Sequence, residues 1–268
     1  MRLASLPMYQ PPELKDATDA WWQGLARHFR AAGIAGVPEH LARPDDLHAH
    51  WRDPALLFSQ GCGFPLTHAF AGQWQVIATP CYAAHGCAGP EYRSVLIVPE
   101  SSAFASLEDL RGRTACYNSE DSHSGCNILR ATFAPLARGG RFFGKVVKSG
   151  GHLRSAAIVQ SGEADVAALD CVTHALYARH APQRLAGTRV LRATEPAPSL
   201  PCITAAATDA GTLAALRAGL AEALADPGLQ AVRETLLIVG AEILPEDAYA
   251  AVWKFEDRAV ACGYRSIA

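Results

Sequence analysis

The sequence has no apolar run that approaches the roughly 20 residues a membrane-spanning helix needs. Its longest apolar stretches are short and β-like, as in residues 94–98. It also has no excess of either charge, because 24 lysines and arginines stand against 26 aspartates and glutamates. We therefore expect a chain that does not span a membrane and that has no nucleic acid as a partner.

Several catalytic signatures are missing as well. The chain contains no nucleophile elbow, P-loop, HExxH motif or dinucleotide fingerprint, so we do not expect an enzyme. Its eight cysteines include no CxxC pair and no Cys–His spacing typical of structural zinc. Most of them suit small buried side chains, although Cys62, Cys81 and Cys87 lie in or beside turns, where two of them could form a disulfide.

The first residues do not resemble an export signal. Residues 1–7 lack the basic, long apolar and small-residue regions of a secretory leader. Two localisations therefore stay open: the periplasm if a leader has been removed, and the cytoplasm if Met1 is the native start.

What the sequence does contain is the pattern of an α/β protein. With 268 residues, half of them hydrophobic, it can fold as one large domain or as two of ordinary size. Strand-like and helix-like segments alternate almost throughout, which is typical of mostly parallel sheets flanked by helices. Two extended segments, 93–98 and 194–201, bracket a self-contained block. We therefore predict two lobes, 1–95 with 198–268 and 96–197, with a hinge at those segments.

The expected elements follow from hydrophobic periodicity and from capping residues. Strands are expected at 2–6, 55–60, 74–78, 93–98, 114–117, 145–148, 164–169 and 189–193. Helices are expected at 12–32, 65–70, 125–135, 152–160, 171–180, 210–226, 227–239 and 245–263.

Several of these strands end in polar or glycine-containing loops. The loops are residues 60–63, 118–125, 149–152 and 170–171. Ligands of open α/β sheets bind outside the carboxyl ends of the strands, so we expect these loops to share one crevice.

The loop at 118–125, here called the serine loop, is the strongest candidate. Ser122, His123 and Ser124 lie just before a predicted helix, where unpaired backbone N–H groups and the helix dipole favour an anion. Asn118 and the hydroxyls add donors, so such a site needs no metal or other cofactor. One serine there could be only an N-cap, but an asparagine, three serines and a histidine in one loop favour a binding role.

Five stretches of the chain carry a family resemblance through their order and spacing. They are YRSVLIV (92–98), SLEDLRG (106–112), DSHSG (121–125), GH (151–152) and GEADVAA (162–168). Over about residues 3–205 the chain resembles the phosphate, phosphite and phosphonate substrate-binding proteins of ABC transporters, the PhnD-like branch of the type II periplasmic binding fold. The resemblance implies two lobes, each a mixed, mostly parallel sheet flanked by helices, with a ligand cleft between them.

The resemblance also implies roles for residues of the serine loop. Ser122, His123 and Ser124 stand where the family grips the phosphonate oxygens, and His152 stands where a family histidine closes on the same group. His123 replaces a small polar residue, so its backbone can serve while its side chain points elsewhere. His152 could equally cap a helix.

Three further candidates lie outside the serine loop. Tyr92 resembles a tyrosine that begins the first interlobe strand. Tyr9 and Gln60 are weaker candidates from the opposite lobe, and each could simply pack or satisfy backbone groups.

Asp170, at the end of a predicted strand, departs from the family pattern. Members that bind aminophosphonates carry an acid about where Val172 stands. A carboxylate at Asp170 would repel an anion unless it meets an amine or a proton of the ligand, and it could equally cap the following helix.

We therefore predict a monomeric, non-catalytic solute-binding protein that captures a small oxyanion for an ABC transporter permease or a sensor kinase. Pyrimidine or sulfonate recognition on the same fold is one alternative. The others are a Cys–His enzyme and the binding of arsenite or a thiophilic metal by thiols and histidines. The thiols in question are Cys62, Cys116, Cys126 and Cys171.

Overall fold

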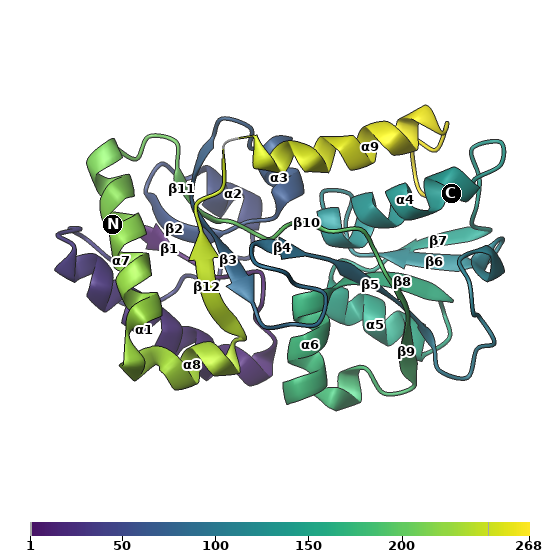
Figure 1. Ribbon diagram of the computed structural model, residues 1–268, viewed down its shortest axis with the longest axis horizontal. Helices are drawn as coiled ribbons and strands as arrows, with labels where there is room; N and C mark the ends of the chain where they lie inside the picture. The colour runs from purple at the N-terminus through teal and green to yellow at the C-terminus, as the bar shows by residue number, and fades with distance from the viewer. Residues whose placement is uncertain (1, 246) are drawn as a thin grey trace. The chain divides into compact units, whose positions relative to one another are not determined.

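The computed structural model describes residues 2–245 and 247–268 and divides the chain into two compact units (Figure 1). Unit 1 comprises Met1–Ala83, Ala88–Pro90 and Pro198–Glu246, and unit 2 comprises Ala84–Cys87, Glu91–Ala197 and Asp247–Ala268. Two positions lie outside the described residues. They are Met1, which would be the native start of a cytoplasmic protein, and residue 246, which falls within the predicted last helix.

Unit 1 is built on a five-stranded sheet of order β1-β2-β11-β3-β12. Its strands are β1 (Leu3–Ala4), β2 (Leu56–Gln60), β3 (Trp74–Tyr82), β11 (Cys202–Ala205) and β12 (Ile238–Glu242). β1 and β2 are parallel, whereas the other neighbouring pairs are antiparallel. The sheet is mixed because β11 and β12 come from the C-terminal part of the chain and return alongside the first strands.

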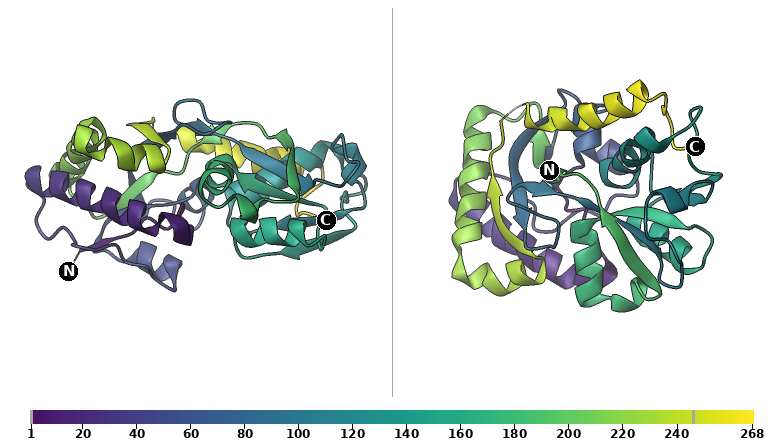
Figure 2. Two further views of the ribbon diagram at one scale, coloured as in Figure 1. Left: turned by 90° about the horizontal axis from the view of Figure 1, so that it is seen from below. Right: turned by 45° about the vertical axis from the view of Figure 1, so that its right-hand side comes forward.

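Helices cover this sheet. They are η1 (Pro12–Leu14), α1 (Lys15–Ala31), α2 (Leu47–Arg52), α3 (Gly63–Thr67), α7 (Ala210–Ala225), η6 (Pro227–Leu229) and α8 (Gln230–Thr235). α1 lies beside α7 and α8 in both views of Figure 2. The aromatic side chains of Trp51, Phe70 and Trp74 form part of the core, with the rings of Phe70 and Trp74 stacked at 4.4 Å. Burial of such large apolar side chains is the main stabilising contribution.

Unit 2 is built on a second five-stranded sheet of order β7-β6-β8-β5-β9. Its strands are β5 (Ser94–Pro99), β6 (Thr114–Tyr117), β7 (Lys145–Lys148), β8 (Val166–Asp170) and β9 (Thr188–Ala193). β7, β6 and β8 run parallel, and β5 runs antiparallel to both β8 and β9. The short strands β4 (Glu91–Tyr92) and β10 (Ala197–Pro198) pair where the chain passes from one unit to the other.

The helices of unit 2 are mostly short. They are η2 (Glu108–Leu110), the π-helix η3 (His123–Asn127), α4 (Ile128–Phe133), η4 (Ala134–Leu136), α5 (His152–Gln160), α6 (Cys171–His180), η5 (Pro182–Arg184), η7 (Ala248–Ala250) and α9 (Ala251–Ala261). α5 packs on β5, β6 and β8, and α9 packs against α4 and η3. No helix of the described residues has the length and apolar character needed to cross a bilayer.

The mixed α/β fold predicted from the sequence is confirmed, with three differences in detail. The sheets are mixed but not mostly parallel: one of the four strand pairs of the unit 1 sheet is parallel, and two of the four pairs of the unit 2 sheet are. Residues 227–239 do not form one helix: α8 ends at Thr235, Leu237 takes a left-handed φ of 59°, and the chain continues as β12 beside β3. Residues 247–268, which we assigned to the first lobe, belong to unit 2. The reason is that α9 buries Val252 and Phe255 in that unit.

Candidate functional site

Three parallel strands of unit 2 bring polar loops to one edge of the sheet. β6 ends at Tyr117, β7 at Lys148 and β8 at Asp170, and the carboxyl ends of parallel strands lie at the same edge. Backbone bonds join the first two loops, because the amides of Ser149 and Gly150 donate to the carbonyls of Tyr117 and Asn118, both at 2.8 Å. Gly150 has a φ of +91°, a left-handed conformation that favours glycine.

Ser122 is the N-cap of η3 within the serine loop. Its Oγ accepts from the Gly125 amide at 3.1 Å and from Nδ2 of Asn118 at 2.9 Å. Two accepted bonds occupy both lone pairs, so the hydroxyl proton is left to donate. The amides of the first helical turn have no carbonyl one turn earlier to bond. This loop therefore presents hydrogen-bond donors, which is the requirement for binding an anion.

Ser124 meets His152 in the same place. Ser124 Oγ lies 2.9 Å from Nε2 of His152, the first residue of α5. The loop is held against the sheet because the Ser94 hydroxyl, at the start of β5, donates to the Ser124 carbonyl at 2.8 Å. The strand ends thus fix both partners of the Ser124–His152 contact.

His152 is a neutral imidazole near pH 7. Burial lowers its pKa to about 4, although the nearby Ala168 carbonyl acts in the opposite direction. Among the described residues, Nδ1 is buried without a well-oriented hydrogen-bond partner. Either Ser124 or His152 can supply the proton of their contact, since the tautomer is free to change. The pair can therefore turn one donor toward a ligand oxygen.

The side chain of His123 packs among aromatic rings and against Asn127. It is buried, and its ring lies 6.4 Å from that of Tyr92 and 5.3 Å from that of Phe255. Nδ1 lies 3.2 Å from Nδ2 of Asn127, and this amide also donates to the Val252 carbonyl at 3.1 Å. Burial lowers the pKa of His123 to about 4. Tyr92, itself buried, packs with His123.

Asp170 caps helix α6. Its Oδ1 accepts from the amides of Val172 at 2.7 Å and Thr173 at 3.1 Å, and the residue is buried. Asp170 also lies opposite Ser94 in the register of β8 and β5, next to the strand that holds Ser124. The capping alternative therefore accounts for the position of this carboxylate, and ligand contact stays a prediction.

Acidic side chains precede the serine hydroxyls. Glu120 accepts from Lys148 and from the Tyr117 hydroxyl, which lowers the pKa of Glu120 to about 2. Asp121 accepts from the Ser119 hydroxyl. The charge of Glu120 is compensated by an ammonium group, so the loop carries less negative charge than its sequence implies.

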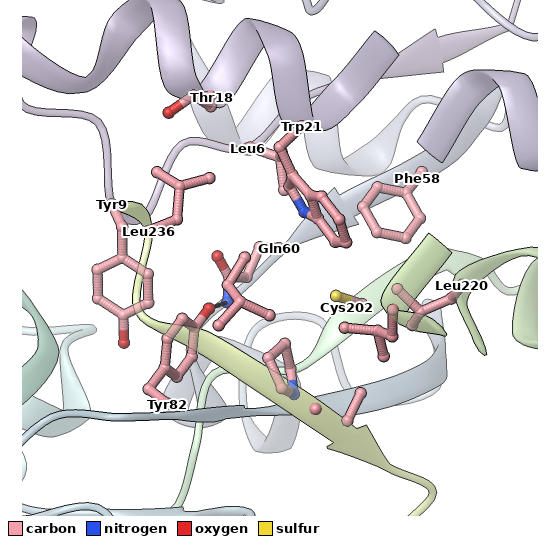
Figure 3. A pocket seen from close by; sticks show the side chains of 15 residues that line it. Leu6, Tyr9, Thr18, Trp21, Phe58, Gln60, Tyr82, Cys202, Leu220 and Leu236 are labelled. Atoms are coloured by element: carbon pink, nitrogen blue, oxygen red, sulfur yellow. Dashed lines mark hydrogen bonds between the residues drawn. The ribbon is translucent and has the colours of Figure 1, made fainter. Parts of the chain in front are cut away.

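Tyr9 and Gln60 lie together in unit 1, at a cavity of about 50 Å³ with a mainly apolar lining (Figure 3). Nε2 of Gln60 donates to the Tyr82 hydroxyl at 2.9 Å and to the Leu200 carbonyl at 3.1 Å. The ring of Tyr9 meets that of Tyr82 edge to face at 5.2 Å. Their role as ligand contacts stays a prediction.

The cysteines do not form the soft-ligand cluster that we considered. All eight are free thiols, and no three histidine, cysteine, aspartate or glutamate side chains of the described residues are arranged to hold a metal ion. Cys87 does not pair with Cys62 or Cys81, and its sulfur instead lies beside that of Cys171.

Two supporting residues were missed by the sequence reasoning. Ser94 holds the Ser124 carbonyl, and Ser149 contacts the Ser155 hydroxyl at 2.7 Å beneath the start of α5. Ser149 was within a predicted loop, which could have indicated it. Nothing in the sequence relates Ser94 to a loop 30 residues later.

The sequence profile of one protein family matches residues 4–249, nearly the whole chain, and that family is described as "ABC transporter, phosphonate, periplasmic substrate-binding protein". The chain belongs to this family. It is a substrate-binding protein of the ABC transporter class and not an enzyme, and the predicted resemblance is confirmed. No curated protein matches the chain in sequence.

Solved structures with low sequence identity share the fold of this binding protein. One is a binding protein component of an ABC phosphonate transporter from Pseudomonas aeruginosa, with 16% identity, 98% of this chain and 87% of that chain covered, and a TM-score of 0.77. Another is PhnD1 from Prochlorococcus marinus in complex with methylphosphonate, with 15% identity, 96% and 97% covered, and a TM-score of 0.75. A third, from Xanthomonas citri and bound to chloride ion, has 15% identity, 97% and 98% covered, and a TM-score of 0.70.

Proposed function

We propose that this binding protein captures a small oxyanion of the phosphonate, phosphite or phosphate type at its serine loop and delivers it to an ABC transporter permease. The observation that carries the proposal is the contact of Ser124 with His152 beside the first turn of η3. Ser122 adds a hydroxyl whose acceptor positions are already occupied. Donors from the starts of η3 and α5 thus lie together, which supports an anion site at this place.

The charges around the loop favour a ligand of low negative charge. The donors named above are neutral, because His152 has a pKa of about 4 without ligand. The carboxylate of Asp121 precedes them in the chain, whereas the charge of Glu120 is compensated by Lys148. A singly charged phosphonate or phosphite meets less repulsion there than a doubly charged anion. One solved neighbour binds methylphosphonate, which makes this compound the first ligand to test.

A thermal-shift screen tests the proposal, since a ligand that binds only the folded chain raises the melting temperature by mass action. The panel is methylphosphonate, phosphite, phosphate, sulfate and an aminophosphonate, each titrated to millimolar concentration. We expect the first two to raise the transition of the intact chain and to lose most of that effect in Ser124→Ala. Absence of a shift with every phosphorus oxyanion would contradict the proposal. Delivery to a sensor kinase instead of a permease would appear as binding without uptake in a transport assay.

A further inference from the structure

Two cysteines of unit 2 that are far apart in the chain lie in contact. Cys87 is in the segment that joins β3 to β4, and Cys171 is the first residue of α6. Their Sγ atoms are 3.5 Å apart, although 84 positions separate the two residues. The backbone at both ends is fixed, because the Cys87 amide donates to the Ala84 carbonyl and the Cys171 amide donates to the Arg93 carbonyl, each at 3.0 Å.

Gly86 makes this approach of the two chains feasible. It has a φ of +104°, which a side chain would strain. A β-carbon at Gly86 would also lie 3.2 Å from Cβ and 3.3 Å from Sγ of Cys171. The absence of a side chain at position 86 therefore lets the segment pass close to α6 and brings Cys87 against Cys171.

The two thiols have different chemical roles. The hydrogen bond from Cys171 lowers the pKa of Cys87, against the opposing effects of burial and of Asp170. The same contact and burial raise the pKa of Cys171. Cys87 is partly exposed, whereas Cys171 is buried. Cys87 is thus the thiol that meets a reagent from solvent, and Cys171 is the thiol that resolves the product.

We propose that Cys87 and Cys171 are a redox pair that forms a disulfide with a small-molecule disulfide oxidant, such as oxidised glutathione. The Cys87 thiol loses its proton to water, and the thiolate attacks one sulfur of the oxidant, which gives a mixed disulfide and releases one thiolate. The Cys171 thiol then loses its proton to that thiolate, and its sulfur attacks Cys87 Sγ and releases a second thiolate, which takes up a proton from water. The sum is two protein thiols and one small disulfide giving one protein disulfide and two small thiols.

This disulfide would join the segment between β3 and β4 to the start of α6. Formation requires the sulfurs to move closer by roughly 1.5 Å to reach a bond length of about 2.05 Å, a shift that rotation of the partly exposed Cys87 side chain can provide. A bond across such a long loop restricts the unfolded chain and raises the melting temperature, by roughly 5–10 °C for a chain of this size.

The test uses the full chain incubated with oxidised glutathione, alkylated under native conditions and digested with trypsin. The pair predicts a cross-link between the tryptic peptides 53–93 and 155–179, since these carry Cys87 and Cys171. Because peptide 53–93 also contains Cys62 and Cys81, fragmentation of the cross-linked species identifies the bonded cysteine. Absence of this cross-link, or a cross-link through Cys62 or Cys81, overturns the proposal.

Variants give a second readout that does not depend on peptide recovery. We expect oxidised glutathione to raise the melting temperature of the intact chain and of Cys126→Ser, the matched control in the same unit, and to leave Cys87→Ser unchanged. Cys87→Ser keeps a small side chain at a partly exposed position, so it tests the pair even where Cys171→Ser fails to fold. An equal shift in Cys87→Ser and in the intact chain would contradict the assignment.

Discussion

A β-carbon placed on Gly125 would lie 2.0 Å from Oδ1 and 2.5 Å from Cγ of Asn118. The side-chain amide of Asn118 thus occupies the space beside Gly125 and, from there, donates through Nδ2 to the Ser122 hydroxyl. Glycine at position 125 allows the serine loop to fold over itself. The hydrogen bonding of Ser122 therefore depends on Gly125, although this residue has no side chain.

Gly125→Ala should therefore weaken oxyanion binding without unfolding the chain. The new methyl group displaces the Asn118 amide, and the Ser122 hydroxyl loses one of its two donors. Without that donor the Ser122 hydroxyl is no longer oriented to donate to the anion, and loss of a hydrogen bond to a charged group should lower the affinity for methylphosphonate by about tenfold or more. Calorimetric titration measures this change.

The double variant Asn118→Ala with Gly125→Ala removes the clash, so it should bind no better and no worse than Asn118→Ala alone. A Gly125→Ala single variant with unchanged affinity would show that the packing of Asn118 is irrelevant to the ligand.

His152 should couple anion binding to proton uptake. Its pKa of about 4 without ligand reflects burial of a neutral ring, and a bound anion beside Nε2 raises that pKa. The complex then binds more protons than the free protein between the two pKa values, so affinity should rise as the pH falls through that range. His152→Gln should lack this contribution. The affinity of both proteins is measured as a function of pH. The titration of the ligand itself affects both profiles equally, so it cancels in the difference between them. Parallel profiles would exclude a role for the ring.

His123 should control stability in acid. Its folded pKa is about 4 and the ordinary value is 6.5, so the unfolded chain binds more protons between these pH values. The stability contributed by the neutral ring is complete above pH 6.5 and is lost as the pH falls to 4, by about 3 kcal/mol. His123→Phe keeps a ring between Tyr92 and Phe255 and cannot titrate. Urea unfolding at pH 7 and pH 4.5 should show a smaller loss of unfolding free energy for this variant than for the intact chain. An identical loss in both proteins would assign the effect to other titrating groups.

Asp170 should act through the helix that it caps. Asp170→Ala removes the acceptor of two amides and should cost about 1–2 kcal/mol of unfolding free energy. Asp170→Asn keeps an Oδ1 acceptor and should restore most of it. The same two variants address the ligand. If the carboxylate only caps α6, the ratio of affinities for an aminophosphonate and its amine-free analogue stays constant in Asp170→Asn, whereas a drop in that ratio would show contact with a ligand amine.

Elements with strong local signals could be predicted from the sequence. β6, β7 and α5 have the predicted bounds, because short apolar runs between polar residues mark the two strands and a glycine pair precedes the helix. The serine loop was also identifiable, since it concentrates polar side chains between a strand and a helix. These features depend on residues close to one another in the chain.

Features that depend on distant residues could not be predicted. The apolar residues Leu236–Val239 suit a helix or a strand equally. The chain from Ile238 onward forms strand β12 because it pairs with β3. The placement of α9 in unit 2 depends on contacts with residues such as His123 and Asn127, more than a hundred positions earlier. The contact of Ser94 with Ser124 is of the same kind. Local periodicity carries no information on such long-range packing.

The central claim is that the Ser124 hydroxyl helps to hold an oxyanion. Calorimetric titration of methylphosphonate into the intact chain, Ser124→Ala and Ser119→Ala tests it most directly, because Ser119 is in the same loop but donates to Asp121. We predict that Ser124→Ala weakens binding by roughly 10- to 100-fold, as expected for a hydrogen bond to a charged group, while Ser119→Ala stays within about threefold of the intact chain. Equal affinities in all three proteins would contradict the account.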